Sequence, residues 1–253
     1  MASIRDRHPE VFRIADELVH FTDGFPWGAS LVHSADPIEN LWRYYNIVFV
    51  VASHRLLRMS VAVMEAGLMF ETLIPLRTHL ELLGTQRYVE ADKGRLVTFA
   101  VRGAKRQQQL VERARRLGHG SRDDWSAMAG RASRDLNRLK DHDANIPLPH
   151  KAEEILKDVG FQDDIDGVLR VADNFVHMNG SALDFYAHAT PTGQIVVEMG
   201  PDTEGANLLL SAVRYHHGIL QVANEALSLK QEGTLAALWD DFQTSFGSPP
   251  AVS

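Results

Sequence analysis

An arginine and a histidine at helical spacing form the main candidate site in this sequence. Arg170 and His177 are seven residues apart, and seven residues of α-helix, at about 100° each, return close to the starting direction. Both side chains are therefore expected on one helix face, with Asp173 between them. A guanidinium can hold a phosphate, and an imidazole can transfer protons at neutral pH. A structural interpretation is also open, because His177 at a helix end favours the helix dipole and Asp173 can pair with it.

A second charged pair lies earlier in the chain. Arg77 and Glu81 are four residues apart on a leucine-rich segment, so a helix there places them side by side. On a largely apolar helix such charges are often partly buried, and each then needs a partner. Taken alone, the pair indicates a structural ion pair. With Asp173 it is expected to form a polar network that supports the Arg170–His177 site.

Positive charge is concentrated in the middle of the chain. The net charge is −7, yet residues 93–140 carry 13 Lys or Arg and 4 Asp or Glu, whereas residues 141–253 carry 5 and 17. The basic segment either packs against acidic helices of the same chain or a partner subunit, or it binds phosphates. The first interpretation is favoured because the acidic remainder repels nucleic acid. Under the second, the candidate nucleic-acid contacts are Arg102, Lys105, Arg106 and Arg113.

Several kinds of chemistry are excluded by what the sequence lacks. The chain has no cysteine, which excludes disulfides, thiolate nucleophiles, zinc–thiolate sites and iron–sulfur clusters. It also has no Gly-rich phosphate loop and no nucleophile elbow. Glu17 and His20 form a single Glu-x-x-His step where a di-iron bundle needs two, and the adjacent His216 and His217 point about 100° apart on a helix. We therefore expect no metal and no cofactor.

The elements that position these residues are mostly helices, because apolar residues recur every three or four positions. Asp36, followed by a proline, is a helix start signal. Gly67 is a stop signal, and Gly233 is expected to break the C-terminal helix. Residues 194–199 predict a short strand, paired with 186–190 in a hairpin. The helices are expected at residues 9–21, 37–66, 70–91, 94–117, 121–140, 151–158, 163–178, 204–230 and 235–246.

These elements predict an all-α, multi-helix bundle with a short β-hairpin before the C-terminal helix. The expected division is an N-terminal helix and loop at 1–36, a single helical bundle domain at 37–246 and a disordered tail at 247–253. No apolar signal region follows the first charged residues, and no run of about 20 apolar residues occurs. We therefore expect a cytoplasmic protein that does not contact membranes.

Two motifs together resemble a known bacterial family. They are Leu76-Arg77-Thr78-His79-Leu80-Glu81 and, much later, Leu169-Arg170-Val171-Ala172-Asp173-Asn174-Phe175-Val176-His177. The combination is similar to a family known only as a domain of unknown function, in which an Arg–Glu helix precedes Tyr-Arg-x-x-Ser-x-x-x-His. The resemblance covers roughly residues 40 to 230. It departs at Leu169, where Tyr is usual, and at Asp173, where Ser is usual.

The Arg-x6-His spacing also resembles the HEPN superfamily of helical bundles. Many HEPN proteins are metal-independent ribonucleases of toxin–antitoxin, antiphage and CRISPR systems. The resemblance implies that Arg170 stabilises a phosphate and that His177 is the acid or base for attack by the RNA 2′-OH. It further implies a homodimer with the site between its subunits. Val171 stands where HEPN motifs usually have Asn, Asp or His.

Three functions therefore follow from the sequence. The first is a HEPN-like ribonuclease or RNA-binding protein of defence or stress systems, which uses the basic helix. The second is a non-enzymatic helical scaffold, in which the charged residues fix the register of the helices. The third is a bundle that binds a small ligand or a metal.

Overall fold

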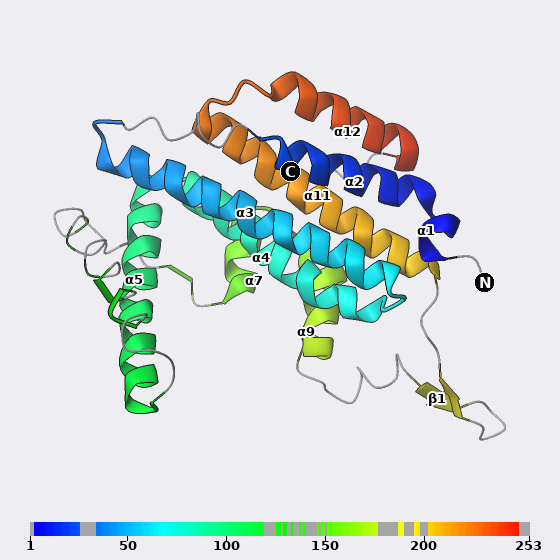
Figure 1. The fold of residues 1–253 in the computed structure, drawn as a ribbon, viewed down its shortest axis with the longest axis horizontal. Helices are drawn as coiled ribbons and strands as arrows, with labels where there is room; N and C mark the ends of the chain where they lie inside the picture. Colours follow the sequence, from blue (N-terminus) through cyan, green and yellow to red (C-terminus); the bar gives the residue numbers. More distant parts are fainter. Residues whose placement is uncertain are drawn as a thin grey trace.

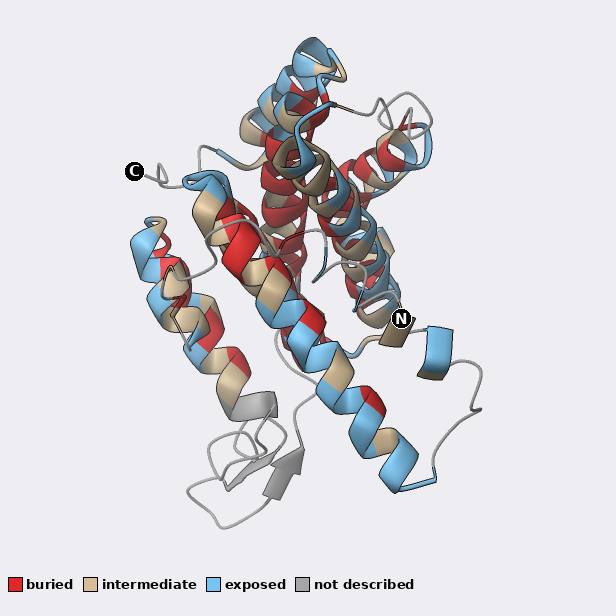
Figure 2. Cartoon of the chain, turned by 90° about the vertical axis from the view of Figure 1, so that its left-hand side faces the viewer, coloured by how far each residue is buried: buried red, intermediate tan, exposed pale blue. Residues whose placement is uncertain are grey.

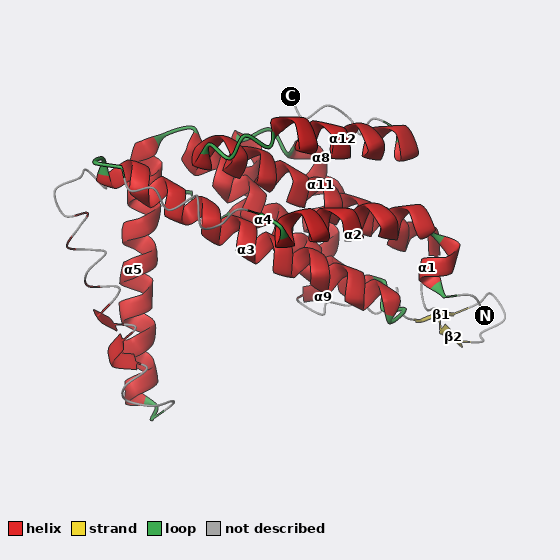
Figure 3. Ribbon diagram, turned by 45° about the horizontal axis from the view of Figure 1, so that its top comes forward, coloured by secondary structure: helices red, strands yellow, loops and turns green. Residues whose placement is uncertain are grey.

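The computed structural model describes residues 3–25, 34–118, 125–127, 129–130, 133, 137, 139, 146, 148–149, 151–176, 187–189, 195–197 and 202–247. In this part of the chain the regular elements are helices, apart from one pair of three-residue strands (Figure 3). The predicted all-α class is confirmed.

Four long helices form the centre of the bundle. α3 (Pro37–Glu65), α4 (Leu73–Glu90) and α11 (Asp202–Leu227) pack against one another, and α2 (Pro9–Asp23) packs against α3 and α11 (Figure 1). Buried residues follow the inward sides of the helices and exposed residues the outer sides (Figure 2). Each large apolar side chain buried here stabilises the fold by about 1.5–3 kcal/mol. The largest fully buried side chains include Phe12, Leu57, Leu80 and Tyr215.

Local sequence signals set the ends of these helices. The side chain of Asp36 accepts a hydrogen bond from the backbone N–H of Ile38 at 2.8 Å, which caps α3 as predicted. Gly67 follows α3 with a φ of +76°, a conformation that glycine adopts without steric cost. The predicted helix boundaries agree with the structure to within about three residues up to α5 (Lys93–Arg116).

The end of α11 corrects one prediction. Gly233 is expected to break the C-terminal helix, but α11 ends at Leu227 and Gly233 lies in the first turn of α12 (Glu232–Phe246). The turn between the helices instead uses Ser228 and Lys230, at φ values of 54° and 57°. Left-handed backbone is unfavourable for residues with a side chain, so a glycine would be expected here. Because neither residue is a glycine, the sequence gives no signal of this turn.

A side chain of α11 stabilises that turn. The Asn224 amide oxygen accepts the backbone N–H of Gln231 at 2.9 Å, and its amide nitrogen donates to the Glu232 carboxylate at 3.0 Å. Asn224 is itself buried. Hydrogen bonds to buried groups of this kind contribute about 0.5–1.5 kcal/mol each, which offsets the cost of the left-handed backbone.

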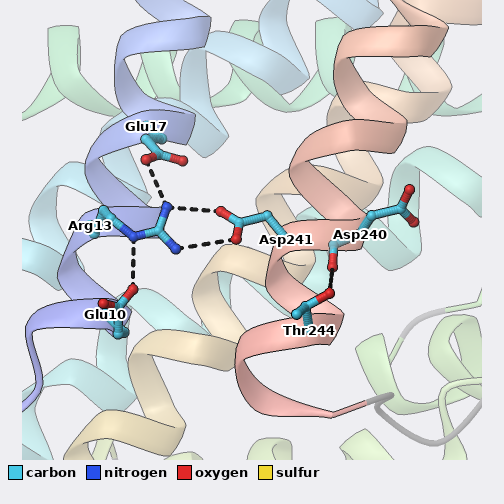
Figure 4. Close-up of polar contacts among 6 residues, drawn as sticks. All are labelled: Glu10, Arg13, Glu17, Asp240, Asp241 and Thr244. Carbon is cyan, nitrogen blue, oxygen red and sulfur yellow. Dashed lines mark hydrogen bonds and ion pairs between the residues drawn. The ribbon is translucent and has the colours of Figure 1, made fainter.

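One arginine ties α2 to α12. The Arg13 guanidinium lies 2.8 Å from Asp241 of α12, and 2.7 and 2.8 Å from Glu10 and Glu17 of its own helix (Figure 4). All four side chains are at least a third exposed, so each pair contributes only about 0–1 kcal/mol. The apolar side of α2, with Leu18 at its centre, belongs to the same core cluster as α3 and α11. The N-terminal helix therefore packs into the bundle that the sequence places at 37–246.

α5 extends away from the bundle. Its first turns contact α3 and α4, and Leu96 belongs to the main core cluster. The rest of α5 runs away from the central helices in both Figure 1 and Figure 3. Asp92 caps its start by accepting the backbone N–H of Gly94 at 2.7 Å.

The segment predicted as one helix at 163–178 is not a regular α-helix. α8 (Gln162–Asp164) leads into a π-helical turn, η3 (Ile165–Leu169), and then into α9 (Arg170–Val176). Residues 177 and 178 lie outside the described residues. The predicted helix is corrected at the π-turn, a feature with i→i+5 hydrogen bonds that is frequent at functional sites. α9 packs against α4.

The remaining elements are short. The two strands pair antiparallel, with His188 opposite Val196. The residues that link the strands are not among those described, so the predicted hairpin stays a prediction. The short elements not yet given are the helices α1 (Ile4–Arg7), η2 (Phe70–Thr72) and α7 (Ala152–Asp158) and the strands β1 (Ala187–Ala189) and β2 (Ile195–Val197).

α3 corrects the expectation that no segment is long and apolar enough to cross a membrane. Of the described helices it alone is long and apolar enough to cross a membrane by length and composition, with a mean hydropathy of 1.6. A core helix of a soluble protein has the same properties. The helix packs against α4 and α11, which accounts for an apolar composition along its buried side.

Candidate functional site

The structure brings Arg77, Glu81 and Asp173 together. Nε of Arg77 donates to Oδ1 of Asp173 at 2.5 Å across the contact between α4 and α9, and its Nη2 lies 3.0 Å from Oε1 of Glu81. The three side chains are 26, 28 and 40% exposed. The contacts expected for the polar network are therefore present, whereas its functional role stays a prediction.

Two carboxylates share one guanidinium in this network. Burial raises the pKa of the Glu81 carboxyl above its usual value, the neighbouring Arg77 lowers it, and Asp173 raises it again. Because both carboxylates already face Arg77, its positive charge is neutralised. The network therefore offers a phosphate no free cation.

Arg170 pairs with carboxylates outside the network. Its side chain is 60% exposed and lies 2.5 Å from Asp166, one turn earlier, and 3.6 Å from Glu153 of α7. His177 lies outside the described residues, so the Arg170–His177 pair stays a prediction. A phosphate would have to displace the two carboxylates from Arg170, which exposed ion pairs permit because they are weak.

A buried cluster fixes the start of the π-turn. The Tyr215 hydroxyl donates to Oδ1 of Asp164 at 2.6 Å, and the guanidinium of Arg214 binds the same oxygen. Burial, together with the charge of Asp164, raises the pKa of Tyr215 well above its usual value, so the hydroxyl stays protonated and donates. Asp164 thus joins the segment before α9 to α11. The sequence analysis does not predict this cluster.

The basic candidates lie on the exposed side of α5. By helix geometry, Arg102, Arg106 and Arg113 lie within about 40° of one another around the helix axis. Ala104 and Val111 are buried and lie on the opposite side. The interpretation that α5 packs its charges against acidic residues is supported at the start of the helix, where Nζ of Lys93 lies 3.9 Å from Oε2 of Glu39 in α3. Further along α5, Arg102, Arg106 and Arg113 have no ion pair with another described residue. The exposed basic candidates are Arg102, Lys105, Arg106 and Arg113.

Four polar residues form a second, unpredicted cluster in the core. Oγ of Ser53 lies 2.5 Å from Nε2 of His79 and 2.6 Å from Nδ1 of His216, whose Nε2 lies 2.9 Å from Oγ1 of Thr22. The four side chains come from α3, α4, α11 and α2. Burial lowers the pKa of His79 to about 3, and burial together with neighbouring histidines lowers that of His216. Both imidazoles are therefore neutral near pH 7.

Two hollows occur on the surface of the described residues, away from these clusters. A groove of about 460 Å³ lies between α2 and α12 and includes Glu17 and His20. A cleft of about 450 Å³ lies among α4, α11 and α12 and includes Glu90, Glu225 and Arg87. Neither hollow is lined by the Arg77 network or by Arg170.

Neither metal-ligand geometry nor similarity to known proteins assigns a function. Within the described residues, no group of three or more His, Asp or Glu side chains is placed to hold a metal ion. Glu17 of the Glu-x-x-His step pairs with Arg13 instead. No protein-family model, curated protein or solved structure matches the chain significantly.

Proposed function

We propose that the protein binds RNA along the outer side of α5. The observation that supports this is the row of exposed arginines, without ion-pair partners among the described residues, opposite the buried side of the helix. Arginine binds phosphate oxygens through its planar fork of N–H groups. From Arg102 to Arg113 the row extends about 16 Å along the axis at 1.5 Å per residue, a length over which several phosphates of one strand can be contacted.

The test is RNA binding by matched double variants. We would follow the fluorescence anisotropy of a labelled 20-nucleotide single-stranded RNA at 0.1 M salt and above. For single strands, log K falls by about 0.7 per phosphate contact for each tenfold rise in salt. Each contact then contributes about fivefold to affinity at 0.1 M salt, so Arg102→Ala/Arg106→Ala should bind about 25-fold more weakly, with a slope smaller by about 1.4.

The control removes the same charge elsewhere. Arg55 and Arg58 are exposed residues of α3, and Arg55→Ala/Arg58→Ala should bind RNA within about twofold of the wild type if α5 is the binding element. Equal weakening in both double variants would mean that binding follows net charge and not α5. No binding by the wild type at 0.1 M salt would reject the proposal altogether.

A HEPN-like ribonuclease is the second candidate. The observation that favours it is the anchoring of α9, which starts at Arg170 and precedes His177 in the sequence: Asp173 joins α9 to α4, and Asp164 joins the segment before α9 to α11. In this proposal Arg170 exchanges its carboxylate partners for a phosphate, and His177 acts as the acid or base. The resemblance places such a site between two subunits, so a homodimer belongs to this proposal.

The same RNA distinguishes the candidates. Cleavage by the wild type that is lost in His177→Ala would establish the ribonuclease, whereas RNA that stays intact while it binds would leave the protein a binder. A protein that neither binds nor cleaves RNA would support the alternative, a non-enzymatic scaffold. In that case the Arg77 network would serve only to fix α9 on α4.

A further inference from the structure

A chain of hydrogen bonds runs through the core, and its proton positions can be assigned. The Thr22 hydroxyl donates to the carbonyl of Leu18 at 2.8 Å. A hydroxyl has a single hydrogen, so Thr22 can only accept from Nε2 of His216. That nitrogen therefore carries the proton of the neutral ring, and Nδ1 of His216 is bare.

The assignment continues to the other end of the chain. The Ser53 hydroxyl must donate to the bare Nδ1 of His216, so its oxygen accepts from Nε2–H of His79. Nδ1 of His79 is then a bare acceptor. It is buried, and it has no hydrogen-bond partner within the part of the chain that the structure describes. Of the four ring nitrogens and two hydroxyls of Thr22, Ser53, His79 and His216, it is therefore the position where a proton can be added without breaking a hydrogen bond.

Among the described residues, no carboxylate forms an ion pair or a hydrogen bond with either ring. Asp23 lies 3.1 Å from His54, and Asp164 is bound by Arg214 and Tyr215. The His216 ring, 5.9 Å from His79, would be the nearest imidazole. The titratable side chains around the pair are His54 of α3 and His217 of α11, which act on His216, and Tyr215 of α11, whose ring lies 6.2 Å from that of His79. Charged residues come one step further out: Asp23 and Arg58 act on His54, and Asp164 and Arg214 act on Tyr215.

We propose that the Thr22–His216–Ser53–His79 chain is an acid-sensitive latch. A proton at Nδ1 of His79 would place an unneutralised charge where α2, α3, α4 and α11 meet, so the closed core excludes it and acid favours the opened state, in which the ring is protonated. Burial independently lowers the pKa of His79 to about 3, below the value of about 6.5 in an unfolded chain. The unfolded state then binds more protons than the folded state below pH 6.5, so stability falls as the pH falls through that value.

The size of the loss of stability follows from the difference between the histidine pKa in the folded and in the unfolded state. At pH 5.5 a histidine with a pKa of about 6.5 in the unfolded chain shifts the folding equilibrium about tenfold toward unfolding, and a second one about tenfold again. His79 and His216 together therefore give a change of about 100-fold between pH 7.5 and 5.5.

The test compares urea unfolding of the full chain at pH 7.5 and 5.5. His79→Gln keeps an N–H that can donate to Ser53 but removes the proton acceptor, so its acid shift in the unfolding constant should be about tenfold smaller than in the wild type. His20→Gln makes the same change at an exposed position and should keep the wild-type shift. A folded His79→Gln protein with the full wild-type shift would overturn the proposal.

A measurement on the wild type covers the case in which His79→Gln fails to fold. The ¹⁵N chemical shifts of the His79 and His216 rings should indicate a protonated Nε2 and a bare Nδ1, unchanged from pH 8 to 5.5 in the folded protein. Titration of both rings with midpoints near 6.5 in the folded state would equally overturn the latch. It would mean that the core accepts the charge without opening.

Discussion

The hydroxyl of Tyr215 offers a direct test of how α11 holds the segment before α9. Tyr215→Phe keeps the ring in its fully buried site and removes only the donor to Asp164, a bond of 2.6 Å. Asp164 retains Arg214 as a partner, so its charge is not left unpaired. A hydrogen bond to a charged group contributes about 1.5–3 kcal/mol. We therefore expect the free energy of unfolding to fall by about 2 kcal/mol.

Asp164→Asn should be more damaging, because it leaves the Arg214 charge without its carboxylate. Removal of one partner of a buried ion pair costs about 3–5 kcal/mol. The Arg214 side chain is 18% exposed and can reach some water, which places the expected loss near about 3 kcal/mol. The order of the two variants therefore tests whether Asp164 or the hydroxyl is the centre of the cluster.

The assay is urea unfolding followed by far-ultraviolet circular dichroism, with the slope m compared between variants. Tyr44→Phe is the matched control, because Tyr44 is 61% exposed. Removal of its hydroxyl should change the free energy of unfolding by less than about 0.5 kcal/mol. If Tyr215→Phe is no less stable than Tyr44→Phe, the hydroxyl does not bind Asp164 in the folded protein. An altered m would mean that the substitution changes the compactness of the unfolded or the folded state, or breaks two-state unfolding.

Two further predictions concern the clusters that join the helices. Ser53→Ala leaves Nε2–H of His79 and Nδ1 of His216 unpaired in the core, and should lower the free energy of unfolding by about 3 kcal/mol more than Ser60→Ala. Ser60 is also buried but donates only to a carbonyl of its own helix, so equal losses in urea unfolding would contradict the bridging role of Ser53. Asp173→Asn removes a negative charge that raises the pKa of Glu81, so the Glu81 carboxyl should titrate at lower pH in ¹³C NMR. An unchanged or higher midpoint would mean that Asp173 does not face the Arg77 network.

Local signals in the sequence predict most helix boundaries because caps and breakers act over only a few residues. Asp36 and Gly67 mark the two ends of α3 in this way. The same reasoning fails at Ser228, where a left-handed residue is held by the side chain of Asn224 and no glycine is present. It also fails at the π-turn 165–169, because apolar periodicity does not distinguish one inserted residue from a regular helix.

The contacts between distant residues are predicted only where the sequence pattern is unusual. Charges on an apolar helix are conspicuous, so Arg77 and Glu81 could be expected to need a partner, and Asp173 provides one. The buried histidines are less conspicuous because each looks like an ordinary polar residue. A signal was nevertheless available: His79 lies between Leu76 and Leu83 at helical spacing, on the side of α4 that is buried.

The distribution of charge explains how an acidic protein can present a binding surface for RNA. The acidic remainder of the chain repels a phosphate backbone, but this repulsion is screened over a Debye length of about 10 Å at 0.1 M salt. α5 is anchored in the core at Leu96, and at 1.5 Å per residue Arg113 lies about 25 Å further along the helix. Arg113 is thus more than two Debye lengths from that anchor, and Arg102 and Arg106 are about 9 and 15 Å from it, along a helix that extends away from the central bundle (Figure 1). The repulsion from the acidic bundle therefore weakens along the row of arginines and does not prevent RNA from binding to α5.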